Sequence, residues 1–273
     1  MSQIGKARWR KDALKKIDSL DLQFTHAAVA TYIKHKSYVK AQHQQMDILN
    51  TLKSDFDKYK TKISPDVIRS TFTSVIRQTC GKFNFSDERS NISHQQSKAS
   101  TTLLERARIA HRITGTHANG IPLGGDINPK SNKYLLLDTG LYLHECKLNI
   151  SELAILPTAE FINNGKLAEM LIGLELLKSG DPFRENSLFY WHREAANSTA
   201  EVDYLMQLNE TVLPIEVKSG TRGAMKSLHM LMAEKSLSLG IRTSQENLGI
   251  LGNIRIIPHY MISDWKRLLT DTH

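Results

Sequence analysis

The chain has 273 residues, of which 40% are hydrophobic and 23% are charged, and its formal net charge is +8. This composition indicates a soluble globular protein with two domains, and it excludes a membrane-spanning class because no apolar run reaches about eighteen residues. The N-terminal segment is basic but lacks the apolar core of a secretory signal. The two cysteines, Cys80 and Cys146, lie far apart in sequence and predict a reducing compartment and no zinc site. We therefore expect a cytoplasmic protein.

The positive charge is concentrated near the N-terminus. Residues 1–62 contain 13 Lys and Arg residues against 6 Asp residues, a balance of +7, whereas the remaining 211 residues are close to neutral at +1. A basic segment of this kind is compatible with contacts to a nucleic-acid backbone, and equally with docking to an acidic partner protein. We favour DNA as the partner, with a partner protein as the alternative.

Helices are predicted over the first part of the chain. Residues 25–60 contain no Gly or Pro and repeat apolar side chains at helical spacing, which predicts helical structure within a basic helical segment at residues 1–62. A second helix begins at Pro65, which suits the first helical position, with Ser64 as its N-cap. Beyond the break at Gly81, residues 82–91 predict a short helix.

Residues 63–127 together predict a winged helix-turn-helix domain. A further helix over residues 93–106 runs into a strand, and the turn-rich residues 115–125 then predict a β-hairpin or wing. This order of helix, short helix, helix and wing is typical of that fold. The helix before the wing would present polar side chains that can reach phosphates or base edges, namely Gln95, Gln96, Lys98, Ser100, Thr101 and Arg106. The alternative is a winged helix that binds only protein.

A mixed α/β domain is predicted over residues 133–273, after a domain boundary at residues 128–132. Its predicted elements are a buried strand at 134–137, a helix at 165–179, strands at 187–194, 201–208, 211–218, 240–244 and from 253, and helices from 223 and at 263–269. Asp138 ends the first of these strands, where a helix cap or a loop hydrogen bond is favoured over a role as a second functional carboxylate.

Glu169 lies on the predicted helix at residues 165–179, which is apolar around most of its circumference. A helix of this kind is buried on more than one side, so the Glu169 carboxylate would be buried without a partner on its own helix. Buried carboxylates need a cation or hydrogen bonds. The sequence therefore marks Glu169 as a candidate site residue.

The two strands that flank residues 209–210 predict a β-hairpin, because apolar and polar residues alternate along both. One face of the first strand would carry Val202, Tyr204, Met206 and Leu208, and the other face Glu201, Asp203 and Gln207. A two-residue loop places Asp203 opposite Glu216, and Glu201 opposite Lys218. A solvated surface explains the second pair, whereas the like charges of the first pair destabilise the sheet.

A bound divalent cation accounts for the unfavourable Asp203–Glu216 pair. Mg²⁺ or Mn²⁺ takes carboxylate oxygens, water and substrate phosphate as ligands, and Glu169 would supply a third carboxylate from its helix. Lys218 would orient the attacking water or stabilise the negative charge that develops on the phosphate. An acid followed, after a spacer of 12 residues, by Glu-x-Lys is the pattern of the PD-(D/E)xK nuclease superfamily.

From about residue 35 to residue 262, the chain resembles the C-terminal half of a bacterial and archaeal family of AAA-superfamily ATPases. The matching stretches are KFNFSDERSNIS, ANGIPLGGDINPK, KYLLLDTGLY, GKLAEMLIGLELL, LFYWHRE, AEVDYLMQ, PIEVKSG, and LGIRTSQEN before IPHYMIS. Proteins of that family carry a P-loop domain, a winged helix and a C-terminal domain of unassigned function that resembles PD-(D/E)xK nucleases. The resemblance implies the nuclease-like positions Glu169, Asp203, Glu216 and Lys218, with Val217 contributing only its backbone carbonyl.

The ATPase half of that family has no counterpart in this sequence, which contains no GxxxxGK[ST] phosphate-binding loop. We therefore expect no ATP site in the chain, whose start falls where the ATPase half would end. A truncated paralogue, a fragment and one half of a split gene are the alternatives, and a separate ATPase subunit would then be a partner. Two functions fit the sequence: a metal-dependent, nuclease-like DNA module, and a non-catalytic regulatory module that binds DNA or protein.

Overall fold

A computed structural model describes residues 23–59, 63–148, 164–180, 186–195, 198–220 and 223–270. Of the basic segment at residues 1–62, residues 1–22 and 60–62 lie outside these ranges. The described residues divide into two compact units, one of residues 23–58 with 140–148 and one of residues 59–139 with 164–270. None of the helices in these ranges combines the length and the apolar composition needed to cross a bilayer.

The first unit is helical. It contains α2 (Gln23–His35), α3 (Tyr38–Asp55), most of the 3-10 turn η1 (Phe56–Tyr59) and most of α6 (Thr139–Glu145). Residues 25–59 are helical as predicted, apart from a break between α2 and α3, where Lys36 adopts a left-handed backbone with φ of 50° and Ser37 caps the next helix by accepting the Lys40 N–H. A serine cap and a left-handed lysine thus break the helix without any Gly or Pro. Lys53 of α3 pairs with Glu145 of α6 at 2.7 Å.

The second unit begins with the helices α4 (Pro65–Gln78) and α5 (His94–Arg106), separated by the 3-10 turn η2 (Glu88–Ser90). Pro65 occupies the start of α4 as predicted, but the Ser64 side chain makes no capping hydrogen bond. At α5, Ser93 and Gln96 form a capping box in which each side chain accepts the other residue's backbone N–H, at 3.2 and 3.0 Å. The sequence alone did not distinguish these two serine caps.

Ser93→Ala is expected to lower the free energy of unfolding by about 1 kcal/mol, because it leaves a backbone N–H at the start of α5 without an acceptor. Ser64→Ala is the matched control, since Ser64 holds the same position before α4 without a side-chain bond, and its effect should stay within a few tenths of a kcal/mol. Urea denaturation of the two variants measures the difference, and equal losses would contradict it.

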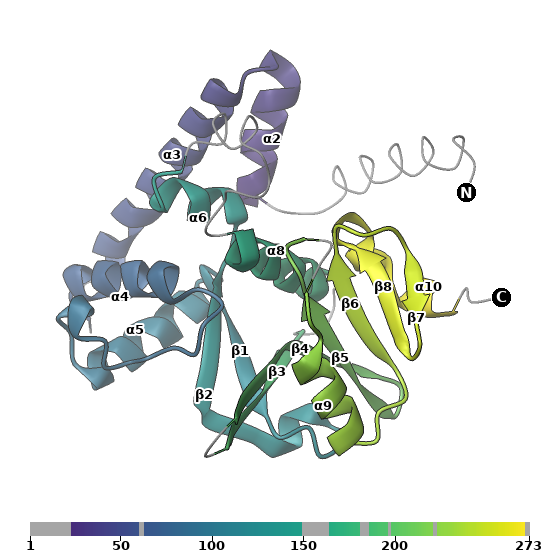
Figure 1. The fold of residues 1–273 in the computed structure, drawn as a ribbon. Coiled ribbons are helices and arrows are strands. Elements are labelled where there is room, and N and C mark those ends of the chain that lie inside the picture. Colours follow the sequence, from purple (N-terminus) through teal and green to yellow (C-terminus); the bar gives the residue numbers. More distant parts are fainter. Residues whose placement is uncertain are drawn as a thin grey trace. The chain divides into compact units, whose positions relative to one another are not determined.

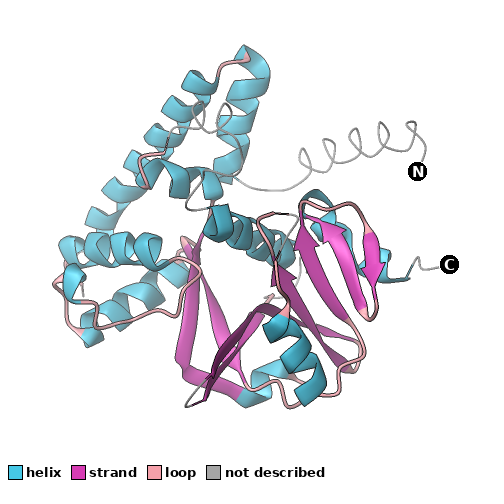
Figure 2. Ribbon diagram, in the orientation of Figure 1, coloured by secondary structure: helices cyan, strands magenta, loops and turns pink. Residues whose placement is uncertain are grey.

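The rest of the second unit is built on an eight-stranded mixed sheet with the strand order β2-β1-β3-β4-β5-β6-β8-β7 (Figures 1 and 2). The strands are β1 (Ala110–Thr116), β2 (Ile127–Leu136), β3 (Leu188–Ala195), β4 (Ser198–Leu208), β5 (Thr211–Val217), β6 (Gly240–Ser244), β7 (Gly249–Leu251) and β8 (Ile254–Pro258). The other elements are η3 (Leu123–Asp126), α8 (Asn164–Lys178), α9 (Lys226–Glu234), η4 (His259–Asp264) and α10 (Trp265–Thr270). The prediction of an α/β fold, with a helical N-terminal part followed by a mixed sheet, is confirmed.

The predicted wing is part of this sheet. The hairpin of β1 and β2 forms as expected, but β1 also pairs in parallel with β3, starting at Ile113 and Leu188. The predicted boundary at residues 128–132 lies inside β2, which begins at Ile127 and is longer than the predicted strand at 134–137. The segments predicted as a winged helix and as an α/β domain therefore contribute strands to one continuous sheet.

Helix α9 covers one face of the sheet. Its Leu228 and Leu231 pack in a buried cluster with Val202 and Leu205 of β4. These four side chains are fully buried, and their removal from water stabilises the helix on the sheet.

Helix α8 packs on the opposite face at close range. Tyr204, next to Leu205 in the strand, points to that face, where its hydroxyl donates to the Glu169 carbonyl oxygen at 2.8 Å. Gly173 permits this approach, because a Cβ there would lie 2.4 Å from the Tyr204 hydroxyl and 2.5 Å from Leu135 Cδ1. The contact holds the helix turn of Glu169 against β4.

Candidate acidic site

The hairpin of β4 and β5 has the register that the sequence predicts. Residue pairs run from Leu208 and Thr211 next to the loop to Tyr204 and Ile215. Asn209 in the loop takes a φ of 52°, which suits a tight two-residue turn. The pairing does not continue to Asp203 and Glu216: instead, the Asp203 Oδ2 atom accepts the backbone N–H of Val217 at 2.7 Å.

A β-bulge in β4 lies at the same level. Phe189 of β3 pairs with Leu205 of β4, and Trp191 pairs with Val202. Between these two pairs β3 has one residue and β4 has two, Asp203 and Tyr204, so β4 contains one extra residue there. The simple alternation predicted for β4 is therefore wrong at this point, because Val202 and Leu205 pack together under α9. The bulge turns Tyr204 to the face of Asp203, toward α8.

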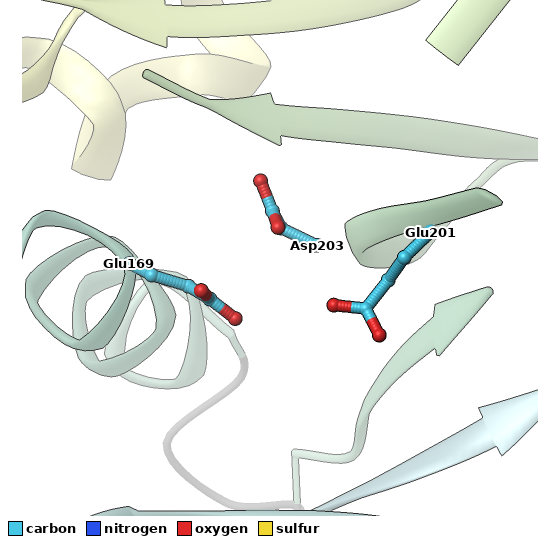
Figure 3. Close-up of side chains that lie close together, drawn as sticks. All are labelled: Glu169, Glu201 and Asp203. Carbon is cyan, nitrogen blue, oxygen red and sulfur yellow. The ribbon is translucent and has the colours of Figure 1, made fainter. Parts of the chain in front are cut away.

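Three carboxylates meet between α8 and β4. Glu169, Glu201 and Asp203 each offer an oxygen atom, and these atoms all lie within 4.8 Å of one another. In Figure 3, Glu169 extends from its helix toward Glu201, and Asp203 lies between them. The hairpin face is only partly solvated, since the Glu201 side chain is 36% exposed and the Glu216 side chain only 7%. Of the predicted site residues, the structure thus brings Glu169 and Asp203 together and adds Glu201.

Lys133 is the residue of this site that sequence reasoning missed. It lies on β2, is fully buried, and places its Nζ atom 3.0 Å from Glu169 Oε1 and 2.5 Å from Glu201 Oε1. A lysine at the start of an apolar strand was the available signal, but the predicted strand began one residue later. The expected pair of Glu201 with Lys218 does not form, because Glu201 takes Lys133 as its partner.

Glu216 and Lys218 lie at the end of β5, next to the three carboxylates. Lys218 Nζ donates to Glu216 Oε1 at 2.5 Å. Glu216 is only 6% exposed, and its Oε2 atom has no hydrogen-bond partner among the described residues. Val217 contributes its backbone N–H to Asp203, whereas the resemblance implied a carbonyl ligand. The predicted residues Asp203, Glu216 and Lys218 are therefore neighbours. Glu216 is not one of the three acids whose oxygen atoms all lie within 4.8 Å of one another.

The site carries more negative than positive charge. Four carboxylates, Glu169, Glu201, Asp203 and Glu216, face two ammonium groups. Burial raises the pKa of Glu169 to about 8, against the opposing effect of Lys133. Burial and the charge of Asp203 raise the pKa of Glu216 to about 7. Near neutral pH, protons thus neutralise part of the excess charge.

The Asp203 and Lys133 pKa values are also shifted. Burial raises the pKa of Asp203, although Lys133 and the Val217 N–H act in the opposite direction. Burial alone would lower the pKa of Lys133, but the three acids around it outweigh burial and raise the pKa. The acids around Lys133 therefore favour its charged form.

The donor set suits a hard divalent cation. Carboxylate oxygens are the ligands that Mg²⁺ and Mn²⁺ prefer, and Asp203 is held in place by a backbone hydrogen bond. The buried, unpartnered Glu216 Oε2 atom is a further available oxygen. The residues present therefore fit such an ion, provided that Lys133 leaves room for it.

The predicted recognition helix α5 has a mixed outcome. Gln95, Gln96, Lys98 and Arg106 are exposed, as contact with DNA requires, although Gln96 also serves the capping box. Ser100 and Thr101 are buried on the inner face of the helix, so they cannot reach DNA. Asp138 is buried directly before α6, the position for which a capping or loop role was favoured.

Two family models match the chain. One, described as a domain of unknown function (DUF8612), matches residues 27–152, and the other, also described as a domain of unknown function (DUF4143), matches residues 164–262. No curated protein and no solved structure gives a significant match. The first match contains Lys133 and the second contains Glu169, Glu201 and Asp203, so the acidic site is assembled from both matched regions.

Proposed function

We propose that the chain is a DNA-associated, nuclease-like module whose acidic site binds Mg²⁺ or Mn²⁺ and hydrolyses a phosphodiester bond. The observation that carries the proposal is the convergence of Glu169 and Asp203 beside the Glu216–Lys218 pair, on the hairpin that bears the acid-x12-Glu-x-Lys pattern. The exposed polar residues of α5 would bind the nucleic acid. The resemblance to the C-terminal half of AAA-superfamily ATPases belongs to this proposal, and a separate ATPase subunit would be a partner.

Each residue has a distinct part in this chemistry. A bound divalent cation would polarise the phosphate and lower the pKa of a coordinated water molecule. The Val217 N–H fixes one oxygen of Asp203 and leaves the other free to face the cation. The Lys218 ammonium, held by Glu216, would stabilise negative charge on the phosphate or orient the attacking water.

One observation favours a non-catalytic alternative. Lys133 already forms short ion pairs with Glu169 and Glu201, so the cluster is supplied with a cation from within the chain. Under this alternative the module binds DNA or a partner protein and regulates it without turnover.

DNA cleavage distinguishes the two functions. Purified protein is incubated with Mg²⁺ or Mn²⁺ and with linear, supercoiled, single-stranded and branched DNA. Asp203→Ala and Lys218→Ala are each expected to lower the cleavage rate by about 100-fold or more, because each removes a group that acts on the reacting phosphate. Lys178→Ala is the matched control, since Lys178 and Lys218 are 23% and 25% exposed and each pairs with a glutamate.

The control variant should cleave at the wild-type rate. An absence of products, or products that persist in both site variants, would exclude catalysis by this site and leave the non-catalytic module.

A further inference from the structure

The Lys133 ammonium group is surrounded by two carboxylates and an aromatic ring. The residue is fully buried, and its Nζ atom lies between the carboxylates of Glu169 and Glu201. On a third side it lies 4.8 Å from the centre of the Tyr190 ring, whose face attracts a cation. The Tyr190 hydroxyl is in turn 2.6 Å from Ser131 Oγ on β2, which fixes the ring. Lys133 is therefore held by specific contacts in this position.

Lys133 and a metal ion at this site would compete for the same carboxylates. Glu169 and Glu201 direct their Oε1 atoms at Lys133, and these two residues with Asp203 form the group whose oxygens share a centre. A divalent ion at that centre would lie within a few ångströms of a buried ammonium group, where like charges repel strongly. Binding of the metal thus requires Lys133 to withdraw.

We infer that Lys133 is a tethered cation that occupies the acidic site in the metal-free protein, and that a divalent metal binds by displacing it. This inference rests on the proposed function, because it concerns control of the same metal site. Lys133 thereby weakens the apparent affinity of the site for the metal.

Displacement has to occur by rotation of the side chain, because the backbone around Lys133 is anchored. The carbonyl oxygen of Asn132 accepts the Phe83 N–H at 2.7 Å, and that of Tyr134 accepts the Cys80 N–H at 3.4 Å. Both donors lie in the segment between α4 and α5. The flexible four-carbon stem of lysine allows the ammonium group to move while β2 stays in place.

Calorimetric titration with MgCl₂ or MnCl₂ tests the inference. If Lys133 is withdrawn in about one molecule in ten, the apparent affinity of the wild type for the metal is weakened about tenfold, and Lys133→Met should recover that factor. Lys53→Met is the control, because Lys53 forms a 2.7 Å ion pair with Glu145 in the other compact unit. Its dissociation constant should equal that of the wild type.

A second comparison covers the case in which Lys133→Met does not fold. The Glu201→Gln variant is compared with a double variant that carries both Glu201→Gln and Lys133→Met, so the two proteins differ only at residue 133. Compared with Lys133→Met alone, the double variant lacks the Glu201 carboxylate and so has one fewer buried negative charge without a partner. It should bind the metal about tenfold more tightly than Glu201→Gln alone. Circular dichroism establishes that each variant is folded before titration.

The outcomes separate the inference from the proposed function. Equal affinity with and without Lys133 would overturn the inference while the metal site stands. Weaker binding without Lys133 would overturn it too, since the lysine would then support the site. If no variant binds either metal, both the inference and the proposed metal chemistry fail.

Discussion

Lys133→Met is expected to lower the free energy of unfolding by about 3–5 kcal/mol at pH 8 and low metal concentration, because breaking a buried ion pair leaves charges without compensation. Lys133 is fully buried and is bonded to Glu169 and Glu201, so two carboxylates lose their partner in one substitution. The loss should be smaller at pH 5, where the glutamates can take up protons instead. Urea denaturation at the two pH values measures both effects.

Two sets of control variants accompany the measurement on Lys133→Met. Lys53→Met removes a partly exposed ion pair and should cost no more than about 1 kcal/mol. Adding Glu169→Gln and Glu201→Gln to Lys133→Met should restore most of the lost stability, because both carboxylates that lost Lys133 as their partner are then replaced by neutral amides. A loss below about 1 kcal/mol for Lys133→Met alone would show that the ion pairs contribute little.

The metal-free protein is expected to lose stability as the pH rises from about 5 to about 8. The pKa of Glu216 is raised in the folded state from 4.5 to about 7, and that of Glu169 from 4.5 to about 8. Over this range the folded chain holds protons that the unfolded chain releases, so the free energy of unfolding falls with pH. For Glu216 the shift corresponds to roughly 3 kcal/mol, which is present below pH 4.5 and is lost as the pH passes through about 7.

Chemical denaturation at a series of pH values, in the presence of a chelator, measures this slope. Glu216→Gln should flatten it, because glutamine has no proton to lose. Mg²⁺ or Mn²⁺ should stabilise the protein more at pH 8 than at pH 5, since the metal replaces the bound protons. Stability that rises between pH 5 and pH 8 in the metal-free wild type would contradict the assignment of these two groups.

Local patterns predicted a large part of the fold. The alternation around residues 209–210 gave the hairpin and its register, and the all-round apolar helix correctly indicated that Glu169 is mostly shielded from solvent. These features depend on residues close together in the sequence and on the spacing of apolar side chains within one helix or strand, both of which can be read from the sequence.

The features that the sequence did not predict depend on contacts between distant segments. The bulge at Asp203 is visible only in the pairing of β3 with β4, and it decides which side chains face α8. Lys133 is 36 residues from Glu169 and 68 from Glu201 along the chain, so nothing near it signalled an acidic partner. The break at Lys36 was missed because a left-handed lysine leaves no mark comparable to Gly or Pro.

The continuity of β1 and β2 with the main sheet limits how this protein can be divided or recombined. A chain reduced to residues 164–270 would leave β3 with an open edge that other strands could join, and Glu169 and Glu201 would lose Lys133. A chain that ends at the boundary expected at residues 128–132 would lose the C-terminal part of β2, the partner of β1. The two segments matched by the family models therefore cannot be exchanged independently between proteins. An exchange would have to keep the lysine in the first segment and its partner carboxylates in the second.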